Sequence, residues 1–281
     1  MRKVSFINMK GGVGKTTLST NVAHCLATRE NCKVLVVDID PQFNATQCFF
    51  SGDKYIEYLK NKGRTILDLF QENVANISTV DGVTGIKSFN YSDIKTIQIL
   101  ENLFMLPGNL NLYQIEISAG SGKENRLKKY LDEINKIYHF DYVIIDTPPT
   151  PSIWMISALL ASDYYIIPVK PDPLSYTGIE LLQNIIYQKK RDLDLNIKCM
   201  GIVLTIVEEG TIVFNKCMET IGKKKQLKDL LYKKYLKKRT DIAKFQLNQQ
   251  FILDQSKDDI KLCLTGIVQE MIKRINDDET K

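Results

Sequence analysis

The sequence has few of the residues from which metal and redox centres are built. Its 281 residues include two histidines and six cysteines, and no two cysteines have C-x-x-C spacing. A zinc or iron–sulfur site formed within one chain is therefore not expected. The cysteines are interpreted as reduced thiols, which are typical of a cytosolic protein.

The sequence also lacks a long hydrophobic run. The apolar stretch near the N-terminus, residues 4–7, is far shorter than a signal peptide or a membrane span requires. No other segment qualifies as a membrane span, so we expect no segment that crosses a membrane and no membrane partner of that kind.

What the sequence does have is a local concentration of positive charge. The net charge is +5, but residues 216–244 contain ten Lys and one Arg against three acidic residues. The hydrophobic and charged fractions, 44% and 25%, are ordinary for a globular protein. The length suits a single α/β domain over residues 1–281.

Short apolar runs alternate with helix-like segments along the chain. Residues 33–38 and 142–146 are continuous apolar runs that end in Asp, a pattern typical of strands buried on both faces of a parallel sheet. We therefore predict an α/β fold with a mostly parallel, twisted sheet and helices on both faces. Ligands of such folds bind beyond the carboxyl ends of the strands. Further strands are predicted at 4–8, 103–106, 164–169 and 197–207, and helices at 16–29, 123–138, 153–161 and 177–190.

The first predicted strand is followed by a glycine-rich loop. Residues 10–17 read KGGVGKTT, and they match the P-loop pattern G-x-x-x-x-G-K-[ST] except that Met9 stands at its first glycine. Glycines let successive backbone N–H groups turn toward an anion, and the following helix adds its positive end. We therefore predict a P-loop NTPase that binds a nucleoside triphosphate with Mg²⁺, with Lys15 on the β- and γ-phosphates and Thr16 on the metal. The residues expected to hold the nucleotide are Gly11, Gly12, Val13, Gly14, Lys15, Thr16 and Thr17.

Lys10 precedes these glycines, so it cannot easily fold back onto the phosphates of its own loop. In a face-to-face dimer it could reach the nucleotide of the partner, much as an arginine supplied in trans does. The alternative is a solvated surface lysine.

Three segments resemble a known family. KGGVGKTT is similar to the deviant Walker A loop of the ParA/MinD superfamily, and residues 38–46, DIDPQFNAT, resemble its DxDPQGNAT segment. Residues 142–149, YVIIDTPP, resemble its Walker B strand. The resemblance covers roughly residues 1–207, and on it the chain is identified as a ParA-type partition ATPase of the small class without an N-terminal helix-turn-helix. One position departs from the pattern, because Phe43 stands where the family has glycine.

The resemblance implies roles for the acidic residues. Asp40 would orient the attacking water and would act with Lys10 and Lys15 in ATP hydrolysis. Asp146 would hold Mg²⁺, through a water, as Walker B acids do. Asp38 would support either the water shell of the metal or the switch. The metal set implied is thus Thr16, Asp38 and Asp146.

The basic stretch contains a possible nucleic-acid surface. In residues 221–239, apolar residues recur at helical spacing while lysines fall mainly on the other side, which predicts a helix with a basic face. Such a face suits DNA backbones without sequence preference, although a membrane surface and plain solvated surface remain alternatives. The DNA-binding candidates are Lys223, Lys224, Lys225, Lys233, Lys234, Lys237, Lys238 and Arg239.

A last helix is predicted at about residues 256–276, where six apolar residues share one face. Its acidic end argues against an anionic membrane, so we expect it to pack on the domain.

The resemblance then implies the function. An ATP-bound sandwich homodimer would bind nonspecific double-stranded DNA, and a ParB-like centromere-binding protein would stimulate slow ATP hydrolysis in the nucleoid-associated cytoplasm. The alternative is a MinD-like positioning ATPase that acts on a membrane or a protein cargo.

Overall fold

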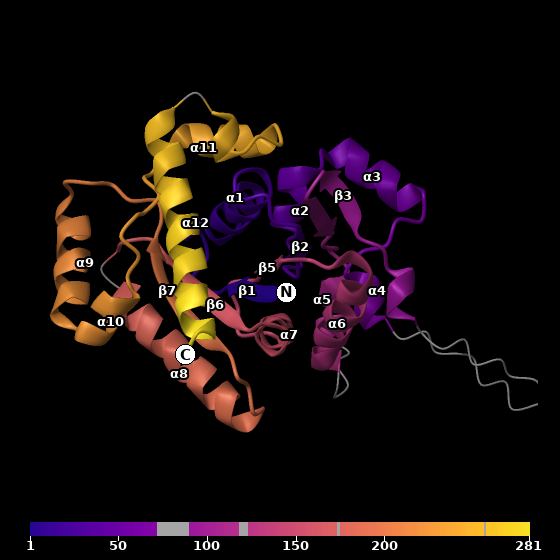
Figure 1. Ribbon diagram of the computed structural model, residues 1–281, viewed down its shortest axis with the longest axis horizontal. Coiled ribbons are helices and arrows are strands. Elements are labelled where there is room, and N and C mark those ends of the chain that lie inside the picture. The colour runs from indigo at the N-terminus through magenta and orange to yellow at the C-terminus, as the bar shows by residue number, and fades with distance from the viewer. Residues whose placement is uncertain (72–89, 118–122, 173–174, 256) are drawn as a thin grey trace, which may run out of the picture.

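The computed structural model describes residues 1–71, 90–117, 123–172, 175–255 and 257–281 (Figure 1). Its centre is a seven-stranded sheet in the order β3-β4-β2-β5-β1-β6-β7. Only the edge pair β3–β4 is antiparallel, and the other pairs are parallel. The predicted mostly parallel α/β fold is confirmed. The strands are β1 (Arg2–Phe6), β2 (Val34–Asp38), β3 (Ile97–Leu100), β4 (Leu103–Leu106), β5 (Tyr142–Asp146), β6 (Tyr164–Val169) and β7 (Lys198–Leu204).

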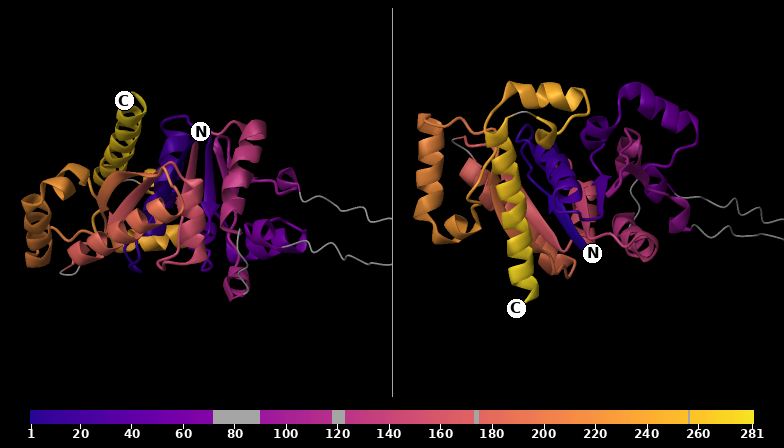
Figure 2. Two further views of the ribbon diagram at one scale, coloured as in Figure 1. Left: turned by 90° about the horizontal axis from the view of Figure 1, so that it is seen from below. Right: turned by 45° about the horizontal axis from the view of Figure 1, so that its top comes forward.

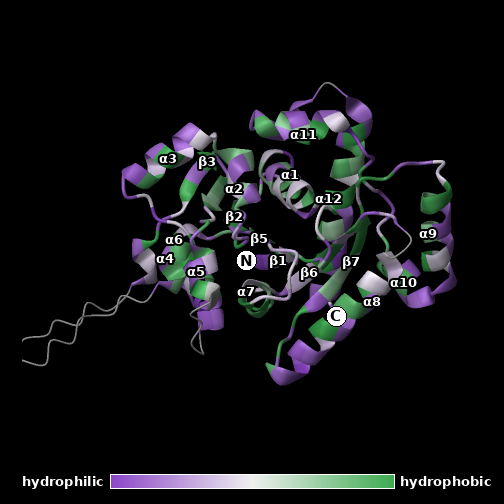
Figure 3. Ribbon diagram, turned by 180° about the vertical axis from the view of Figure 1, so that it is seen from behind, coloured by the Kyte–Doolittle hydropathy of each residue, from purple (hydrophilic) through white to green (hydrophobic). Residues whose placement is uncertain are grey.

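Helices cover both faces of the sheet, and every residue of the central strands β2 and β5 is buried. In β5, Tyr142 and Ile144 join a core with α1 and α12, whereas Val143 and Ile145 join a core with α6 and α7 on the opposite face. A third core lies between β6, β7 and α8. In Figure 3, β7 is coloured mostly as hydrophobic, whereas α3 and α11 mix hydrophobic and hydrophilic residues. The helices of the first half are α1 (Lys15–Thr28), α2 (Asn44–Phe49), α3 (Gly52–Lys60), α4 (Leu67–Phe70), α5 (Leu112–Ile117) and α6 (Arg126–Tyr138); those of the second half are α7 (Ile153–Ala161), α8 (Ser175–Asp192), α9 (Ile212–Lys223), α10 (Lys225–Leu230), α11 (Thr240–Leu247) and α12 (Asp258–Glu279), with single 3₁₀ turns at Tyr91–Asp93, Lys123–Asn125 and Ile252–Asp254.

The register of the central strands brings the sequence motifs together. Asp146, the last residue of β5, lies opposite Phe6 of β1 on one side and Asp38 of β2 on the other. The loop after β1 and the acids that end β2 and β5 therefore meet at the carboxyl edge of the sheet, as expected for a parallel α/β fold.

The predicted basic helix over residues 221–239 is wrong in its second half. α10 ends at Leu230, and residues 231–239 run in an extended conformation beside β7 until α11 begins. Tyr232 N donates to the Ile202 carbonyl at 2.9 Å, and Leu236 N donates to the Leu204 carbonyl at 3.0 Å. The open edge of β7 offers unpaired backbone groups, and pairing with them replaces the hydrogen bonds of a helix.

The predicted C-terminal helix is present as α12, which starts at Asp258; residue 256, where the prediction began, lies outside the described residues. The six apolar residues of its inner face are all buried. α12 crosses the molecule beside α1 and β7 (Figure 1). At one end of the molecule, α11 and α3 flank α1 and α2 (Figure 2). No helix in the described part of the chain is long and apolar enough to cross a membrane.

Candidate functional site

The loop between β1 and α1 has the geometry that an anion site requires. Gly12 and Gly14 adopt left-handed backbone angles, with φ of 68° and 76°, which glycine reaches without steric cost. α1 begins directly afterwards at Lys15, so its positive N-terminal end lies at the loop. Thr205, just beyond β7, fixes the loop by donating its hydroxyl to the Val13 carbonyl at 2.5 Å. A phosphate group bound to this loop would contact the backbone N–H groups of the loop and also the positive N-terminal end of α1.

Lys15 is held over the loop. Lys15 is only 7% exposed, and its Nζ donates to the Lys10 carbonyl at 3.3 Å. Burial lowers the pKa of Lys15, while the carboxylates of Asp146 and Asp40 act in the opposite direction. The ammonium group is thus placed to contact phosphate oxygens of a bound nucleotide.

The side chain of Lys10 lies in different surroundings. Its Nζ forms an ion pair with Asp172, in the loop that follows β6. The side chain is 49% exposed. The structure therefore brings the backbone of Lys10 to Lys15 but does not bring its ammonium group into the cavity of its own chain.

Thr16 and Asp146 form the part of the site that fits a metal. The Thr16 hydroxyl donates to Asp146 Oδ2 at 2.8 Å, and Ser19 donates to Oδ1 at 2.9 Å. Burial raises the pKa of Asp146 to about 6, although these two hydrogen bonds oppose the shift. A hydroxyl and a carboxylate, completed by waters, are the oxygen ligands that Mg²⁺ prefers. This donor set is consistent with the predicted metal site.

Asp38 is engaged in the loop that follows it. Its Oδ2 accepts hydrogen bonds from the backbone N–H of Thr46 at 2.7 Å and from the Thr46 hydroxyl at 2.8 Å, and its Oδ1 accepts from Asp40 N at 3.2 Å. Burial next to Asp146 raises the pKa of Asp38 well above its ordinary value. These contacts join Asp38 to the loop that follows β2, and both roles expected for Asp38 stay predictions.

Asp40 belongs to the same loop and lines a cavity that also contacts residues 11–17 of the phosphate loop. Its Oδ1 accepts a hydrogen bond from Gln42 N at 2.9 Å, and burial raises its pKa. Its carboxylate therefore lies beside the place where the phosphates would bind, as a residue that orients water must.

Phe43 occupies a backbone conformation that favours glycine, with φ 43° and ψ 37°. Its ring stacks on Tyr55 of α3, with centroids 5.5 Å apart. Stacking of this kind offsets part of the cost of the left-handed conformation, which is about 1–2 kcal/mol. This is how the chain accommodates Phe at the position where the resemblance leads us to expect glycine.

Two cavities share lining residues at the phosphate loop. The larger, of about 850 Å³, extends from the loop to Tyr55 of α3 and Leu247 of α11. The smaller, of about 170 Å³, shares Gly14, Thr17, Ala243 and Gln246 with it and is otherwise walled by Thr205, Ile206, Leu236, Lys237, Lys238, Arg239 and Ile242.

Sequence analysis missed the contribution of α11. Gln246 Oε1 accepts a hydrogen bond from the Thr17 hydroxyl at 3.2 Å across 229 residues of sequence. Its Nε2 lies 3.6 Å from Cys48 Sγ of α2. No sequence motif in residues 240–250 identifies Gln246 as a site residue, because the place of its side chain depends on how α11 packs in the fold.

The eight DNA-binding candidates do not form one face. Lys223 pairs with Glu219 and Lys224 with Glu180 near α10, whereas Lys237, Lys238 and Arg239 pair with Glu209, Glu208 and Asp259 beside the smaller cavity. The other three, Lys225, Lys233 and Lys234, are exposed. The structure thus divides the predicted basic surface and neutralises part of it.

Comparison with known proteins gives a consistent family. The family described as AAA domain (AAA_31) matches residues 1–199. The sporulation initiation inhibitor protein Soj of Bacillus subtilis is 31% identical over 232 residues, which cover 82% of this chain and 81% of Soj. A ParA family protein of Mycoplasma genitalium is 30% identical over 235 residues, with the same two coverages of 82% and 81%.

The fold is also that of a solved structure. A putative plasmid partition protein of Borrelia burgdorferi, bound to AMPPNP, aligns over 99% of both chains with a TM-score of 0.75 and 24% identity. Together with the sequence relatives, the phosphate loop and the acids at the strand ends, this places the chain in the ParA-type family of P-loop ATPases.

Proposed function

We propose that this chain is a DNA-partition ATPase that binds and hydrolyses ATP with Mg²⁺. The observation that carries the proposal is the meeting of Lys15, Asp40 and the Thr16–Asp146 pair around one cavity of about 850 Å³. The partition role is supported by a relative named chromosome partitioning protein ParA, from Myxococcus xanthus, which is 29% identical over 220 residues, and by the plasmid partition protein of Borrelia burgdorferi that shares the fold.

The geometry supports one placement of the nucleotide. Its phosphates lie on the loop from Gly11 to Thr17, with Lys15 on the β- and γ-phosphates. Thr16 and Asp146 would hold Mg²⁺, which would supply positive charge to offset that of the phosphates. Asp40 orients the attacking water. The base enters the smaller cavity, because that cavity adjoins Gly14 and Thr17 and combines apolar walls with Thr205 and Gln246, as base pockets do.

The finer parts of the proposal concern partners. Two ATP-bound subunits form a sandwich dimer in which Lys10 of each subunit reaches the nucleotide of the other. The dimer binds nonspecific double-stranded DNA of the nucleoid in the cytoplasm, and a ParB-like protein stimulates hydrolysis. The exposed lysines Lys225, Lys233 and Lys234 contribute to the DNA surface. Lys223, Lys224, Lys237, Lys238 and Arg239 contribute less than the sequence suggests, because the acidic side chain beside each of them offsets its charge toward the DNA backbone.

The test is binding to a duplex of random sequence in the presence of ATP, ADP or no nucleotide, at low and moderate salt. We expect tight, salt-sensitive binding only with ATP. The Lys15→Ala variant is the matched control, because it loses a charged phosphate interaction worth about 1.5–3 kcal/mol and should bind DNA in no nucleotide state. Absence of DNA binding by the unaltered protein would reject the DNA role. Binding to anionic vesicles instead would favour the positioning alternative.

A further inference from the structure

The segment that walls the smaller cavity is held along its length by α12. This segment, residues 231–239, is called the strap. Its far end supplies Leu236, Lys237, Lys238 and Arg239 to the cavity wall. On one side it is hydrogen-bonded to β7 and the residues that follow it, where Val207 N donates to the Leu236 carbonyl at 3.0 Å and Lys238 N to the Val207 carbonyl at 2.8 Å.

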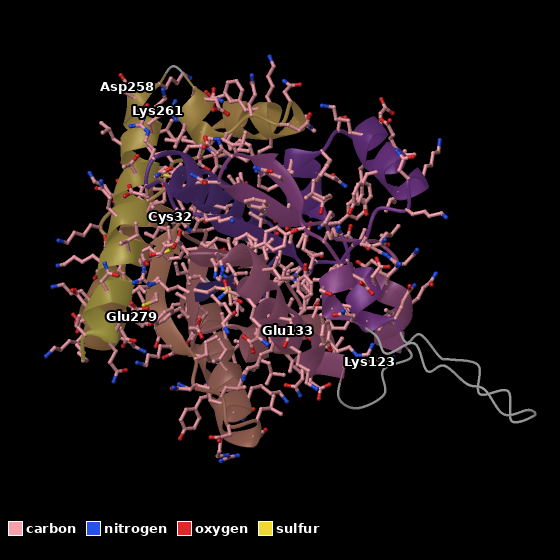
Figure 4. All side chains as sticks on the ribbon, turned by 45° about the vertical axis from the view of Figure 1, so that its right-hand side comes forward. Cys32, Lys123, Glu133, Asp258, Lys261 and Glu279 are labelled. Carbon is pink, nitrogen blue, oxygen red and sulfur yellow. The ribbon has the colours of Figure 1, made fainter. Side chains whose placement is uncertain are left out.

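The other side of the strap lies against α12. Asp258 and Glu279 mark the two ends of this helix (Figure 4). Near its start, Asp259 forms an ion pair with Arg239 at the end of the strap. In its middle, a Cβ added to Gly266 would lie 2.9 Å from Cγ of Lys234, so the helix and the strap approach closely there.

The strongest attachment is at the beginning of the strap. The guanidinium of Arg274 donates from Nη1 to the Leu230 and Met200 carbonyls, both at 3.1 Å, and from Nη2 to the Leu231 carbonyl at 3.0 Å. It also lies over the Tyr232 ring, 4.4 Å from the centroid. One side chain therefore joins β7, the end of α10 and the start of the strap.

Glu270 completes this attachment. Its Oε1 accepts from Arg274 Nη2 at 2.7 Å, and its Oε2 accepts from Lys233 N at 3.0 Å. The side chains of Arg274 and Glu270 are only 22% and 15% exposed. A paired, partly buried guanidinium with its donors on backbone carbonyls is rigid and costly to disrupt. The register of the strap against β7 is thus set from α12.

We propose that Arg274, with Glu270, is a positioning residue for nucleotide-base recognition. It fixes the strap, and the strap presents Leu236 to Arg239 to the base. Arg274 itself touches no nucleotide. This inference rests on the proposed placement of the base in the smaller cavity. We therefore expect the affinity for the base to depend on Arg274 of α12, whereas the affinity for the phosphates should not depend on this residue.

The experiment compares the affinities for MgATP and for magnesium tripolyphosphate, which has the phosphates and lacks the base. The variants are Arg274→Gln, Arg274→Lys and Glu270→Gln, and Lys273→Gln is the matched control, because Lys273 is its exposed neighbour at 76% exposure. We expect Arg274→Gln to lose roughly tenfold in ATP affinity, the size typical of coupling through a packed network. Tripolyphosphate affinity should stay within twofold, Arg274→Lys should recover part of the ATP affinity, and Lys273→Gln should behave as the unaltered protein.

Two outcomes would overturn the inference. One is unchanged ATP affinity in Arg274→Gln and Glu270→Gln. The other is an equal loss of ATP and tripolyphosphate affinity, which would mean general damage to the phosphate loop. If Arg274→Gln does not fold, Glu270→Gln decides alone, because it keeps the guanidinium and weakens only the pair. If the unaltered protein binds ATP no better than tripolyphosphate, the placement of the base fails instead. If it binds neither, the proposed function fails.

Discussion

Lys10 and Lys15 stand five positions apart in one loop, yet they have different environments. Lys15 is buried over the loop, and Lys10 pairs with Asp172 outside the cavity. Burial suits a lysine that works on the phosphates of its own chain. An exposed lysine at the rim of the site is free to exchange Asp172 for a phosphate group of a second subunit, because a surface ion pair is worth only about 0–1 kcal/mol.

The trans role of Lys10 predicts complementation between two inactive variants. Lys10→Ala and Asp40→Ala should each lower ATP turnover by roughly tenfold or more. In a mixed dimer, one site combines an intact Asp40 with the intact Lys10 of the partner. Mixing the two variants should therefore restore part of the activity, with a maximum near equal amounts. The measurement is the ATP hydrolysis rate at constant total protein. If Lys10 acts on its own nucleotide, both sites of the mixed dimer are defective and no mixture recovers activity.

At the scale of elements, α1 is joined to the connection between α11 and α12 through a buried histidine. His24 of α1 stacks on Phe251, with ring centroids 4.3 Å apart and planes at 9°. Its Nε2 is 4.0 Å from Asp254 Oδ1. Burial lowers the pKa of His24, and Asp254 opposes the shift only in part. The packing of α1 against this connection therefore favours the neutral imidazole over the protonated one.

This packing predicts a pH dependence of stability with a defined sign. In the unfolded chain the imidazole takes up a proton near pH 6.5, but in the native protein it does so only at lower pH. The free energy of unfolding should therefore fall as pH falls below about 6.5, by up to about 1.4 kcal/mol per pH unit from this group. His24→Gln should remove that contribution, as measured by urea unfolding between pH 7 and pH 5.

The control for this prediction is the other histidine, His139, which ends α6 with a positive φ of 53°. His139→Asn tolerates that angle and should retain the slope of the unaltered protein. The slopes must be compared between variants, because Asp38 and Asp146 have raised pKa values and act with the opposite sign. Equal slopes for His24→Gln and the unaltered protein would show that His24 is not responsible.

At the scale of the whole molecule, the fold separates the positive charge that the sequence gathers. Lys225 begins α10, and Lys233 and Lys234 lie on the strap. The remaining candidates are paired with acids of α8, α9, α12 or the segment after β7. DNA affinity depends on the number of phosphates that are neutralised. The exposed lysines outside these ion pairs should therefore determine it.

We expect the triple variant Lys225→Ala, Lys233→Ala, Lys234→Ala to weaken ATP-dependent DNA binding and to reduce its salt dependence. The slope of log affinity against log salt should become shallower by roughly 2–3, at about 0.9 for each phosphate that is no longer neutralised. The measurement is a DNA titration with MgATP between about 50 and 200 mM salt. Lys189→Ala, Lys190→Ala, Arg191→Ala at the end of α8 removes the same charge elsewhere and should leave the slope unchanged. Equal effects of the two triples would mean that only net charge matters.

The sequence by itself determined the phosphate loop and the acids at the strand ends. These features are local: a buried strand, a glycine-rich turn and a helix start follow one another within residues 2–16, and apolar runs ending in Asp identify β2 and β5. A mostly parallel sheet then places the carboxyl ends of these strands at the same edge, regardless of the conformation of the connecting loops.

Only the tertiary structure decided what depends on interactions between distant segments. The spacing of Tyr232 and Leu236 suits a helix, but the open edge of β7 and the guanidinium of Arg274 hold them in a strap. Asp38 and Asp146 look alike in sequence, but their contacts differ, because Thr46 hydrogen-bonds to one carboxylate and Thr16 to the other. Local spacing cannot fix such outcomes, because backbone groups pair with whichever partner the packed fold brings to them.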